Sequence, residues 1–118
     1  MYSSLIEKVS DLNDLIIEGN QTEALEKYYH TEVEIQENDL APVCGLNLYR
    51  KKIAQFHESV IEWRSAQPVH VAIGEGVTMV EWFQQYSLKE FGDKQVMFVA
   101  IQEWTNGKII REKIYYKS

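Results

Sequence analysis

A carboxyl residue at the end of a short strand-like run is the position of this chain best suited to proton transfer. Glu37 closes the run Val33-Glu34-Ile35-Gln36-Glu37, in which apolar and polar residues alternate. A carboxyl at the rim of an apolar hollow can act as a general base, because burial raises its affinity for a proton. A solvated acid at a strand end explains the same residue equally well. Glu37 is therefore a candidate catalytic residue.

His57 is the second residue that could do chemistry. It lies one helical turn after Ile53 in an amphipathic segment, so we expect it to face a sheet and to polarise a ligand or shuttle a proton. A histidine that only forms a hydrogen bond inside a core is the commoner case. The three histidines, at 30, 57 and 70, show no metal-ligand spacing, and no cysteine lies close to one. We expect neither a metal site nor a cofactor.

A row of aromatic and amide side chains follows on a predicted strand. Trp82, Gln84 and Tyr86 alternate and so share one face. A two-residue turn at Gly92-Asp93 would continue that face with the next strand. Such an aromatic wall with a few polar points is typical of a small-molecule pocket, although a core packed solid with aromatic rings would look the same. The predicted ligand-binding residues are His57, Trp82, Gln84, Tyr86, Ile101, Glu103 and Glu112.

These residues need a framework of helices followed by strands. Apolar residues recur at helical spacing over residues 3–18, 23–29 and 46 to about 64, with the strand 33–37 between the second and third helix. After Pro68 the apolar period becomes two, which predicts strands at about 68–74, 77–89, 95–105 and 108–117. The fold class is therefore α+β, with a curved, mostly antiparallel sheet wrapped around three N-terminal helices.

The dipeptide Asn106-Gly107 predicts a tight two-residue hairpin, because it suits a turn with two positive φ angles. Such a turn would pair Glu103 with Ile110 and would leave both faces of the strand 95–105 apolar. The three helices are too few to cover both faces, so we expect a second copy of the chain to cover one. The predicted homodimer face carries Phe98, Ala100, Trp104, Lys113 and Tyr115.

Composition limits the remaining possibilities. The 118 residues suit one domain, 1–118, and 45% hydrophobic with 25% charged residues is usual for a globular protein. The net charge of −6 and the lack of any basic cluster larger than Arg50-Lys51-Lys52 argue against nucleic acid as a partner. No apolar run is long enough for a membrane helix, no signal peptide is visible, and Cys44 is the only cysteine. We expect a cytoplasmic protein that does not associate with a membrane.

The layout resembles the nuclear transport factor 2-like superfamily, in particular its SnoaL-like branch of small single-domain proteins. Three stretches carry the resemblance: residues 24–37, a helix that feeds a short strand ending in an acid; Gly45, which opens the long helix; and residues 104–112, which run into Tyr115-Tyr116. The resemblance implies a cone-shaped SnoaL-like or cystatin-like roll. It also implies that the outer face of the sheet commonly forms a dimer.

The same resemblance implies several activities. Glu37 matches the general base of ketosteroid isomerase, but the oxyanion-hole tyrosine and aspartate are replaced by Leu12 or Asn13 and by Ala100 or Ile101. Without those donors an enolate is poorly stabilised, which disfavours ketosteroid isomerisation. The catalytic residues that the cyclases and epoxide hydrolases of this fold would imply are not all present at matching positions of this sequence either. Binding of a small, largely apolar molecule is the preferred function. A cofactor-free isomerase, dehydratase or cyclase that uses Glu37 as general base is the alternative.

Overall fold

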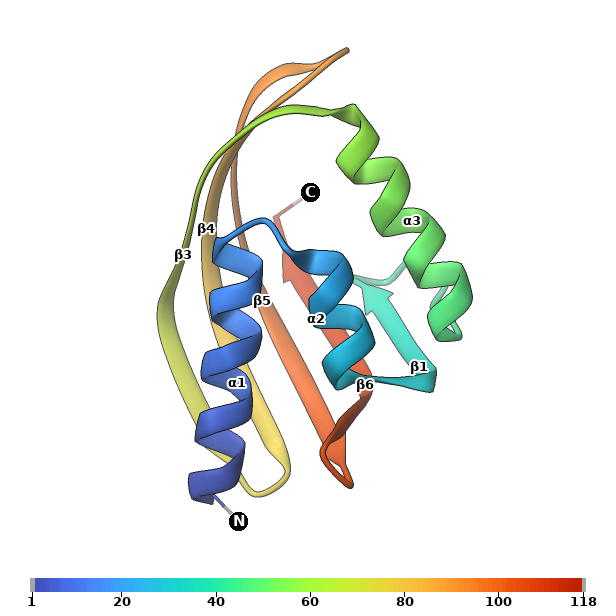
Figure 1. Ribbon diagram of the computed structural model, residues 1–118, viewed down its shortest axis with the longest axis vertical. Helices are drawn as coiled ribbons and strands as arrows, with labels where there is room; N and C mark the ends of the chain where they lie inside the picture. The colour runs from blue at the N-terminus through green and yellow to red at the C-terminus, as the bar shows by residue number, and fades with distance from the viewer. Residues whose placement is uncertain (1, 118) are drawn as a thin grey trace.

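The computed structural model describes residues 2–117 and contains three helices and six strands (Figure 1). The helices are α1 (Tyr2–Ile17), α2 (Gln21–Tyr28) and α3 (Leu46–Ser59). The strands are β1 (Tyr29–Glu37), β2 (Val43–Cys44), β3 (Val60–Gly74), β4 (Val77–Leu88), β5 (Gly92–Thr105) and β6 (Lys108–Tyr116). Among these described residues, no helix has the length and apolar character that a membrane crossing requires.

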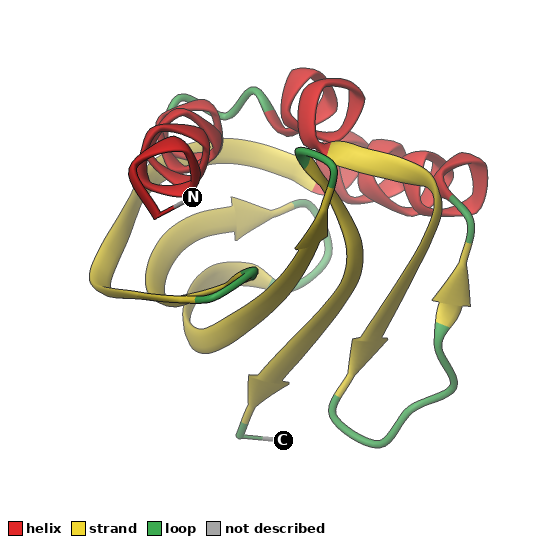
Figure 2. Cartoon of the chain, turned by 90° about the horizontal axis from the view of Figure 1, so that it is seen from below, coloured by secondary structure: helices red, strands yellow, loops and turns green. Residues whose placement is uncertain are grey.

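All six strands form one sheet in the order β2-β1-β6-β5-β4-β3. Every pairing is antiparallel except that of β1 with β6, which is parallel. The sheet curls strongly, and the three helices lie together on one side of it (Figure 2). The predicted α+β class and mostly antiparallel, curved sheet are therefore confirmed.

The helices are held by apolar residues that meet the inner face of the sheet. In α1 these are Leu5, Val9, Leu12 and Ile16, which recur at the spacing of one helix face and are buried. From the sheet, Val80, Trp82 and Ile109 are almost completely buried and belong to the same core. The core therefore lies between the helix layer and the inner face of the sheet, as the apolar spacing of the helices and strands indicates.

The third helix is shorter than its apolar spacing predicts. It ends at Ser59, and the long strand β3 begins at Val60 instead of at Pro68. Val60 and Trp63 continue the helical spacing from Phe56, but β-branched and aromatic residues favour a strand. Trp63 consequently lies on a strand, opposite Tyr86 of β4.

The pairing of β5 with β6 follows the prediction only in its first step. Thr105 pairs with Lys108, and Asn106 and Gly107 both have positive φ, as a tight Asn-Gly turn requires. The register then shifts, so that Glu103 pairs with Arg111 and Ile110 is the extra residue. Because a shift of one residue moves side chains to the opposite face, the predicted faces of β6 relative to β5 are wrong.

A second register difference separates β4 from β5. The turn that joins them is Lys89–Phe91, with Leu88 opposite Gly92, instead of a turn at Gly92-Asp93. Trp82 therefore pairs with Phe98. Ile101 and Glu103, predicted to line the pocket, instead lie on the outer face with Met79 and Val77.

The predicted homodimer face is split by the same shifts. Ala100 and Trp104 belong to the buried core, and Phe98 packs against it, so these three residues face the helices. Lys113 and Tyr115 lie on the outer face, opposite Ile101 and Val99. The five residues cannot form one surface.

Candidate functional site

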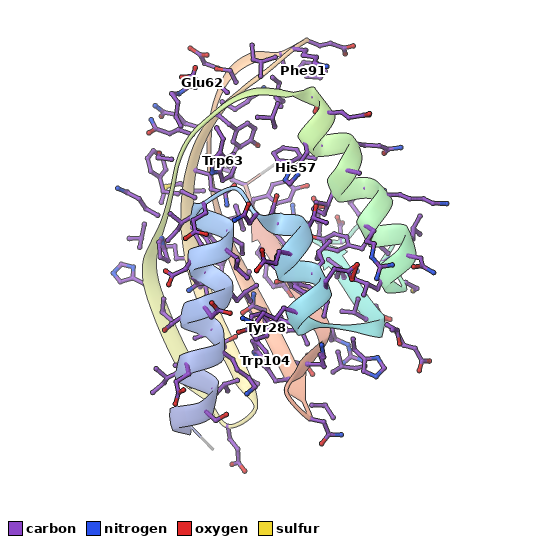
Figure 3. The ribbon with its side chains drawn as sticks, viewed as in Figure 1. Tyr28, His57, Glu62, Trp63, Phe91 and Trp104 are labelled. Carbon is purple, nitrogen blue, oxygen red and sulfur yellow. The ribbon has the colours of Figure 1, made fainter. Side chains whose placement is uncertain are left out.

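A hollow of about 170 Å³ opens where the connection between α1 and α2 approaches the end of α3 and the start of β3. We call it the His57 hollow. Trp63 from β3 and His57 from α3 approach each other in this region (Figure 3). The hollow is lined by Gly19, Gln21, His57, Val60 and Trp63. Its only ionisable lining side chain is the imidazole.

Trp63, which lines the hollow, packs against two further rings, Tyr86 and Phe56, and we call these three rings the aromatic wall. Trp63 and Tyr86 are nearly parallel, with ring centroids 5.7 Å apart and planes at 16°. Phe56 meets the edge of Tyr86 at 5.2 Å and 86°. Such arrangements stabilise aromatic pairs beyond the area that they bury. The three rings come from α3, β3 and β4, so the wall joins the helix layer to the sheet.

Trp63 is fixed in place from its other side as well. Its Nε1–H donates a hydrogen bond to the carbonyl oxygen of Ile17 at 3.2 Å. Gly19 has φ of +81°, and a Cβ there would lie 3.4 Å from the Trp63 Cδ1 atom. A side chain at position 19 would be strained and crowded against the indole, so the α1–α2 connection needs glycine here.

His57 is half-buried at the hollow, in agreement with the prediction that it faces inward. Its Nε2 lies 2.9 Å from the Oε1 atom of Gln21. Burial lowers the pKa of His57, which favours the neutral ring at neutral pH. The imidazole is thus an uncharged hydrogen-bonding group. Its partner, Gln21, is the first residue of α2.

Trp82, Gln84 and Tyr86 lie together on the inner face of β4, and all three are buried. Tyr86 belongs to the aromatic wall, and burial raises its pKa. Trp82 and Gln84 lie further along the same face and do not line the His57 hollow. Tyr86 does not line the hollow either, but it stacks on Trp63, which does.

Glu112 is buried, 3% exposed, in a series of hydrogen-bonded polar side chains that we call the polar chain. We call this part of the inner face the closed end because the Glu112 carboxyl is enclosed there. Trp104 Nε1–H donates to Thr78 Oγ1 at 2.9 Å, and the Thr78 hydroxyl donates to Gln102 Oε1 at 2.6 Å. Gln102 Nε2–H donates to Glu112 Oε2 at 2.8 Å. Tyr29 donates its hydroxyl proton to Glu112 Oε1 at 2.8 Å. Every hydrogen bond of the polar chain is donated in the direction of the Glu112 carboxyl.

Burial raises the pKa of Glu112, and the two hydrogen bonds from Gln102 and Tyr29 oppose that shift. The indole N–H can only donate, which fixes the direction of every later bond in the chain. Glu112 was predicted to bind a ligand, but its carboxyl is enclosed by these partners. The sequence gives no signal for this network, because its members come from β1, β4, β5 and β6.

Glu37 is the last residue of β1 and points to the inner side, opposite Ile114 of β6. It lies at the rim and is exposed, as expected for the end of this strand. The Tyr116 hydroxyl donates a hydrogen bond to Glu37 Oε1 at 3.1 Å, and this bond raises the pKa of Tyr116. Glu37 does not line the His57 hollow.

Two further inward positions bear on a proton-transfer site. Tyr49 of α3 packs its ring 6.1 Å from that of Tyr29, and burial raises its pKa. Asn13, at a position where the resemblance implies an oxyanion-hole tyrosine, is buried. Its Oδ1 atom has no hydrogen-bond partner among the described residues. An amide oxygen only accepts hydrogen bonds, so this atom cannot stabilise an oxyanion, and Asn13 could do so only through its N–H₂ group.

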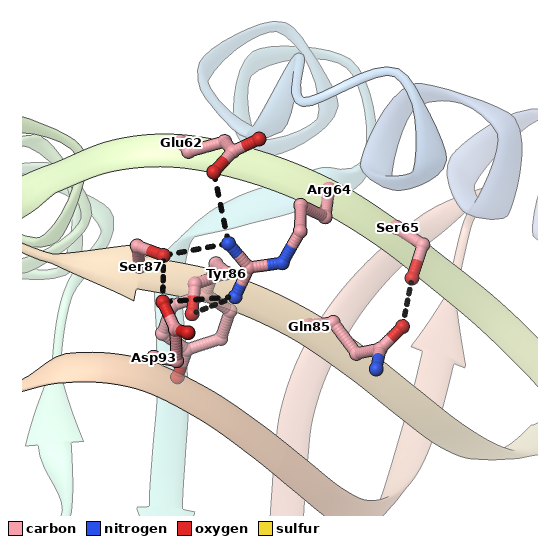
Figure 4. A network of polar contacts seen from close by, with 7 residues as sticks. All are labelled: Glu62, Arg64, Ser65, Gln85, Tyr86, Ser87 and Asp93. Atoms are coloured by element: carbon pink, nitrogen blue, oxygen red, sulfur yellow. Dashed lines mark hydrogen bonds and ion pairs between the residues drawn. The ribbon is translucent and has the colours of Figure 1, made fainter.

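Arg64 ties together strands β3, β4 and β5 beside the aromatic wall (Figure 4). Its guanidinium donates to Ser87 Oγ at 2.6 Å and to the Tyr86 carbonyl oxygen at 3.0 Å. It also lies 2.9 Å from Glu62 Oε1 and 3.5 Å from Asp93 Oδ1. Because Arg64 follows Trp63 and bonds to Tyr86, this network holds the stacked pair at the hollow.

A second hollow, of about 460 Å³, lies at the opposite end of the molecule between α1 and two hairpin turns. Its polar lining includes Lys8, Glu75 and Asn106, together with glycines 74, 76 and 107. None of the predicted site residues lines it. Sequence reasoning missed both this hollow and the role of Trp63, because Trp63 was assigned to a helix.

No protein-family model matches this chain, and no curated protein matches it in sequence. Solved structures do match. A candidate SnoaL-like polyketide cyclase from Mesorhizobium loti superposes with a TM-score of 0.79 at 22% identity, covering 95% of this chain and 98% of that one. An NTF2-like protein of unknown function from Burkholderia pseudomallei gives 0.82 at 11% identity, covering 97% and 91%. TerC, co-crystallised with polyporic acid, gives 0.78 at 13% identity, covering 97% and 92%.

The curled sheet, the three helices on its inner side and these superpositions define an α+β cone. The chain has the nuclear transport factor 2-like fold in its SnoaL-like form. Identities of this size establish the fold and leave the activity open, since this fold supports many functions.

Proposed function

We propose that this protein binds a small, largely apolar molecule in the His57 hollow, between the helices and the inner face of the sheet. The observation that carries this proposal is the fixed aromatic wall beside a lining that holds one neutral imidazole and no charged group. A preformed, mostly apolar hollow with few polar groups is the usual composition of a small-molecule site. TerC, which shares this fold, supports the proposal because it was crystallised with an organic ligand.

The Trp63 indole N–H provides a direct probe of binding. The chain has three tryptophans, so a ¹H–¹⁵N spectrum contains three indole signals, which single Trp→Phe variants assign. Titration with toluene, an uncharged single-ring probe, should shift the Trp63 signal saturably and leave that of Trp104 in place. Trp63→Ala should abolish binding, whereas Phe91→Ala, on the exposed β4–β5 turn, should not. Toluene that moves all three signals alike, or none, contradicts the proposal.

A cofactor-free proton-transfer enzyme that uses Glu37 as general base is a second candidate. It is supported by the inward direction of Glu37 at the rim and by the adjacent Tyr116 hydroxyl, which can donate to a developing oxyanion. A candidate polyketide cyclase and a candidate isomerase are among the solved structures with this fold. The exposure of Glu37 and its absence from the His57 hollow make this the weaker candidate.

Exchange of α-protons in D₂O tests this second function without knowledge of the natural substrate. Acetophenone, an enolisable aromatic ketone, is incubated with the protein, and the loss of its methyl proton signal is followed by NMR. A general base at position 37 predicts exchange that is faster than in buffer and that falls at least tenfold in Glu37→Gln. Equal rates for the wild type and this variant count against Glu37 as a base.

A second copy of the chain is proposed to cover the outer face of β4, β5 and β6. Three large apolar side chains there are strongly exposed: Met79 at 44%, Met97 at 55% and Tyr115 at 45%. The register places Met79 opposite Ile101 and Tyr115 opposite Val99, so the apolar residues form a continuous patch. Contiguous exposed apolar patches mark interaction surfaces, and a symmetric dimer is the commonest assembly.

Sedimentation equilibrium tests the dimer at micromolar concentration, where twice the chain mass of 13.8 kDa is expected. Met97→Glu should give the monomer mass without loss of the folded spectrum, because this residue lies on the outer face. Ile6→Glu, exposed on α1, is the matched control and should stay dimeric. A wild type that sediments as a monomer contradicts the proposal.

A further inference from the structure

We infer that the His57 hollow selects neutral single-ring ligands that carry a hydrogen-bond donor, such as phenols, and that His57 Nδ1 accepts that hydrogen bond. This inference rests on the proposed binding function of the same hollow. It adds the chemical class of the ligand and names the residue that determines specificity.

The size of the hollow suits one ring. Its volume is about 170 Å³, close to that of an engineered apolar cavity of roughly 150 Å³ that binds benzene. Val60 and the indole of Trp63 supply apolar surface, and Gly19 contributes no side chain. A larger ligand would have to extend out of the hollow along the rim.

The hydrogen bond between His57 and Gln21 fixes the position of the imidazole proton. Gln21 Oε1 is an amide oxygen and can only accept, so the proton shared with it at 2.9 Å belongs to His57 Nε2. A neutral imidazole carries one proton, which leaves Nδ1 with a free lone pair. The ring therefore offers a hydrogen-bond acceptor and no second donor.

Nδ1 is not used by the hydrogen bonds of the described residues, in which His57 bonds only through Nε2. Asn13 Oδ1 is the one fully enclosed side-chain polar atom that lacks a partner in that part of the chain. Nδ1 is therefore neither satisfied nor sealed inside the protein.

The remaining polar groups of the lining do not favour a charged ligand, and the Gln21 amide N–H₂, which can only donate, suits a phenol hydroxyl that accepts as well as donates. The Trp63 indole N–H is already donated to the Ile17 carbonyl oxygen. The lining contains no lysine or arginine to balance an anion and no carboxylate to balance a cation. A neutral donor group attached to an apolar ring meets these conditions, because it satisfies Nδ1 and leaves no ligand charge unpaired.

The test compares 4-fluorophenol with 4-fluorotoluene, which have similar shapes but differ in one hydroxyl donor. Binding is measured by ¹⁹F NMR, and the site is located through the Trp63 indole signal. An acceptor in the hollow predicts that the phenol binds roughly three- to tenfold more tightly, the ratio that one net hydrogen bond supplies. Without an acceptor the order is reversed, because the phenol loses its hydrogen bonds to water on entry.

His57→Phe should reverse the preference while 4-fluorotoluene still binds, and thermal unfolding verifies that the variant is folded. Ring ¹⁵N chemical shifts give a readout that does not depend on ligands or variants: they should show the neutral ring with its proton on Nε2. Equal or weaker binding of the phenol by the wild type, or a proton on Nδ1, overturns this inference while leaving the proposed function intact. Failure of both probes to bind at the Trp63 signal overturns the proposed function itself.

Discussion

The two ends of the inner face treat their polar groups in opposite ways. At one end, the polar chain satisfies both oxygens of Glu112 and encloses them. At the other end, His57 keeps an unused ring nitrogen beside an open hollow. Buried polar groups cost free energy unless they are hydrogen-bonded, so the first arrangement favours stability and a unique strand register. The second arrangement leaves one nitrogen of His57 without a hydrogen bond, so that it is free to bind a ligand.

The strongest test of this comparison is Glu112→Ala. The substitution leaves the Gln102 amide and the Tyr29 hydroxyl without their acceptor and opens a void in the sheet interior. We expect a loss of about 3–4 kcal/mol in the free energy of unfolding. Urea unfolding monitored by circular dichroism measures this loss. A loss below about 1 kcal/mol would show that the polar chain does not hold the closed end together.

Trp63→Ala should have the next largest effect, at the open end. The indole stacks on Tyr86 and bonds to the Ile17 carbonyl oxygen, but it remains partly exposed. We expect a loss of about 2–3 kcal/mol, below the value for a fully buried tryptophan, together with loss of ligand binding. Trp63→Phe should keep part of the stack and recover part of both. The comparison of the two ends fails if the alanine variant still binds toluene as the wild type does.

Much of the fold could be predicted from local patterns in the sequence. The helical period of α1, the alternation of β4 and the Asn106-Gly107 turn depend on residues close together in the chain, and each is confirmed. The shared face of Trp82, Gln84 and Tyr86 follows from that alternation alone. Patterns of this kind require no knowledge of what packs against them.

The parts that could not be predicted depend on single insertions in the strand pairings. The extra residue Ile110 and the three-residue turn at Lys89–Phe91 each change which residues of neighbouring strands share a face. As a result, Glu103 moved to the outer face. A bulge reverses the facing of every later residue while leaving the alternation of each strand unchanged, so the sequence carries little trace of it.

Arg64→Met tests how the open end keeps its shape. The variant removes hydrogen bonds to Ser87 and the Tyr86 carbonyl while preserving much of the aliphatic side chain. We expect a loss of about 1–2 kcal/mol and broadening of the Trp63 indole signal, because the strands behind the aromatic wall become less ordered. Glu62→Gln, which alters only an exposed ion pair of Arg64, should cost at most about 0.5 kcal/mol. Equal effects of the two variants would indicate that the ion pair, and not the link between strands, is what matters.

The smallest expected effect is a pH dependence of the free energy of unfolding, which Glu112 at the closed end causes. Burial holds the pKa of Glu112 above its ordinary value, so the folded protein retains a proton that the unfolded chain has already released. Over that interval the folded state binds more protons, and stability must fall as pH rises. The contribution is complete below the ordinary glutamate pKa and is lost as the pH passes through the raised value.

Glu112→Gln isolates this contribution, because glutamine does not titrate and every other group is the same in both proteins. The amide oxygen can accept from the Gln102 N–H₂ while the amide N–H₂ donates to the Tyr29 hydroxyl oxygen, so the variant imitates the protonated carboxyl. The stability of the wild type relative to this variant should therefore be highest near pH 4 and should fall toward pH 7. Parallel urea unfolding curves across that range measure it, and a constant difference would mean that the carboxyl of Glu112 does not titrate abnormally in the folded protein.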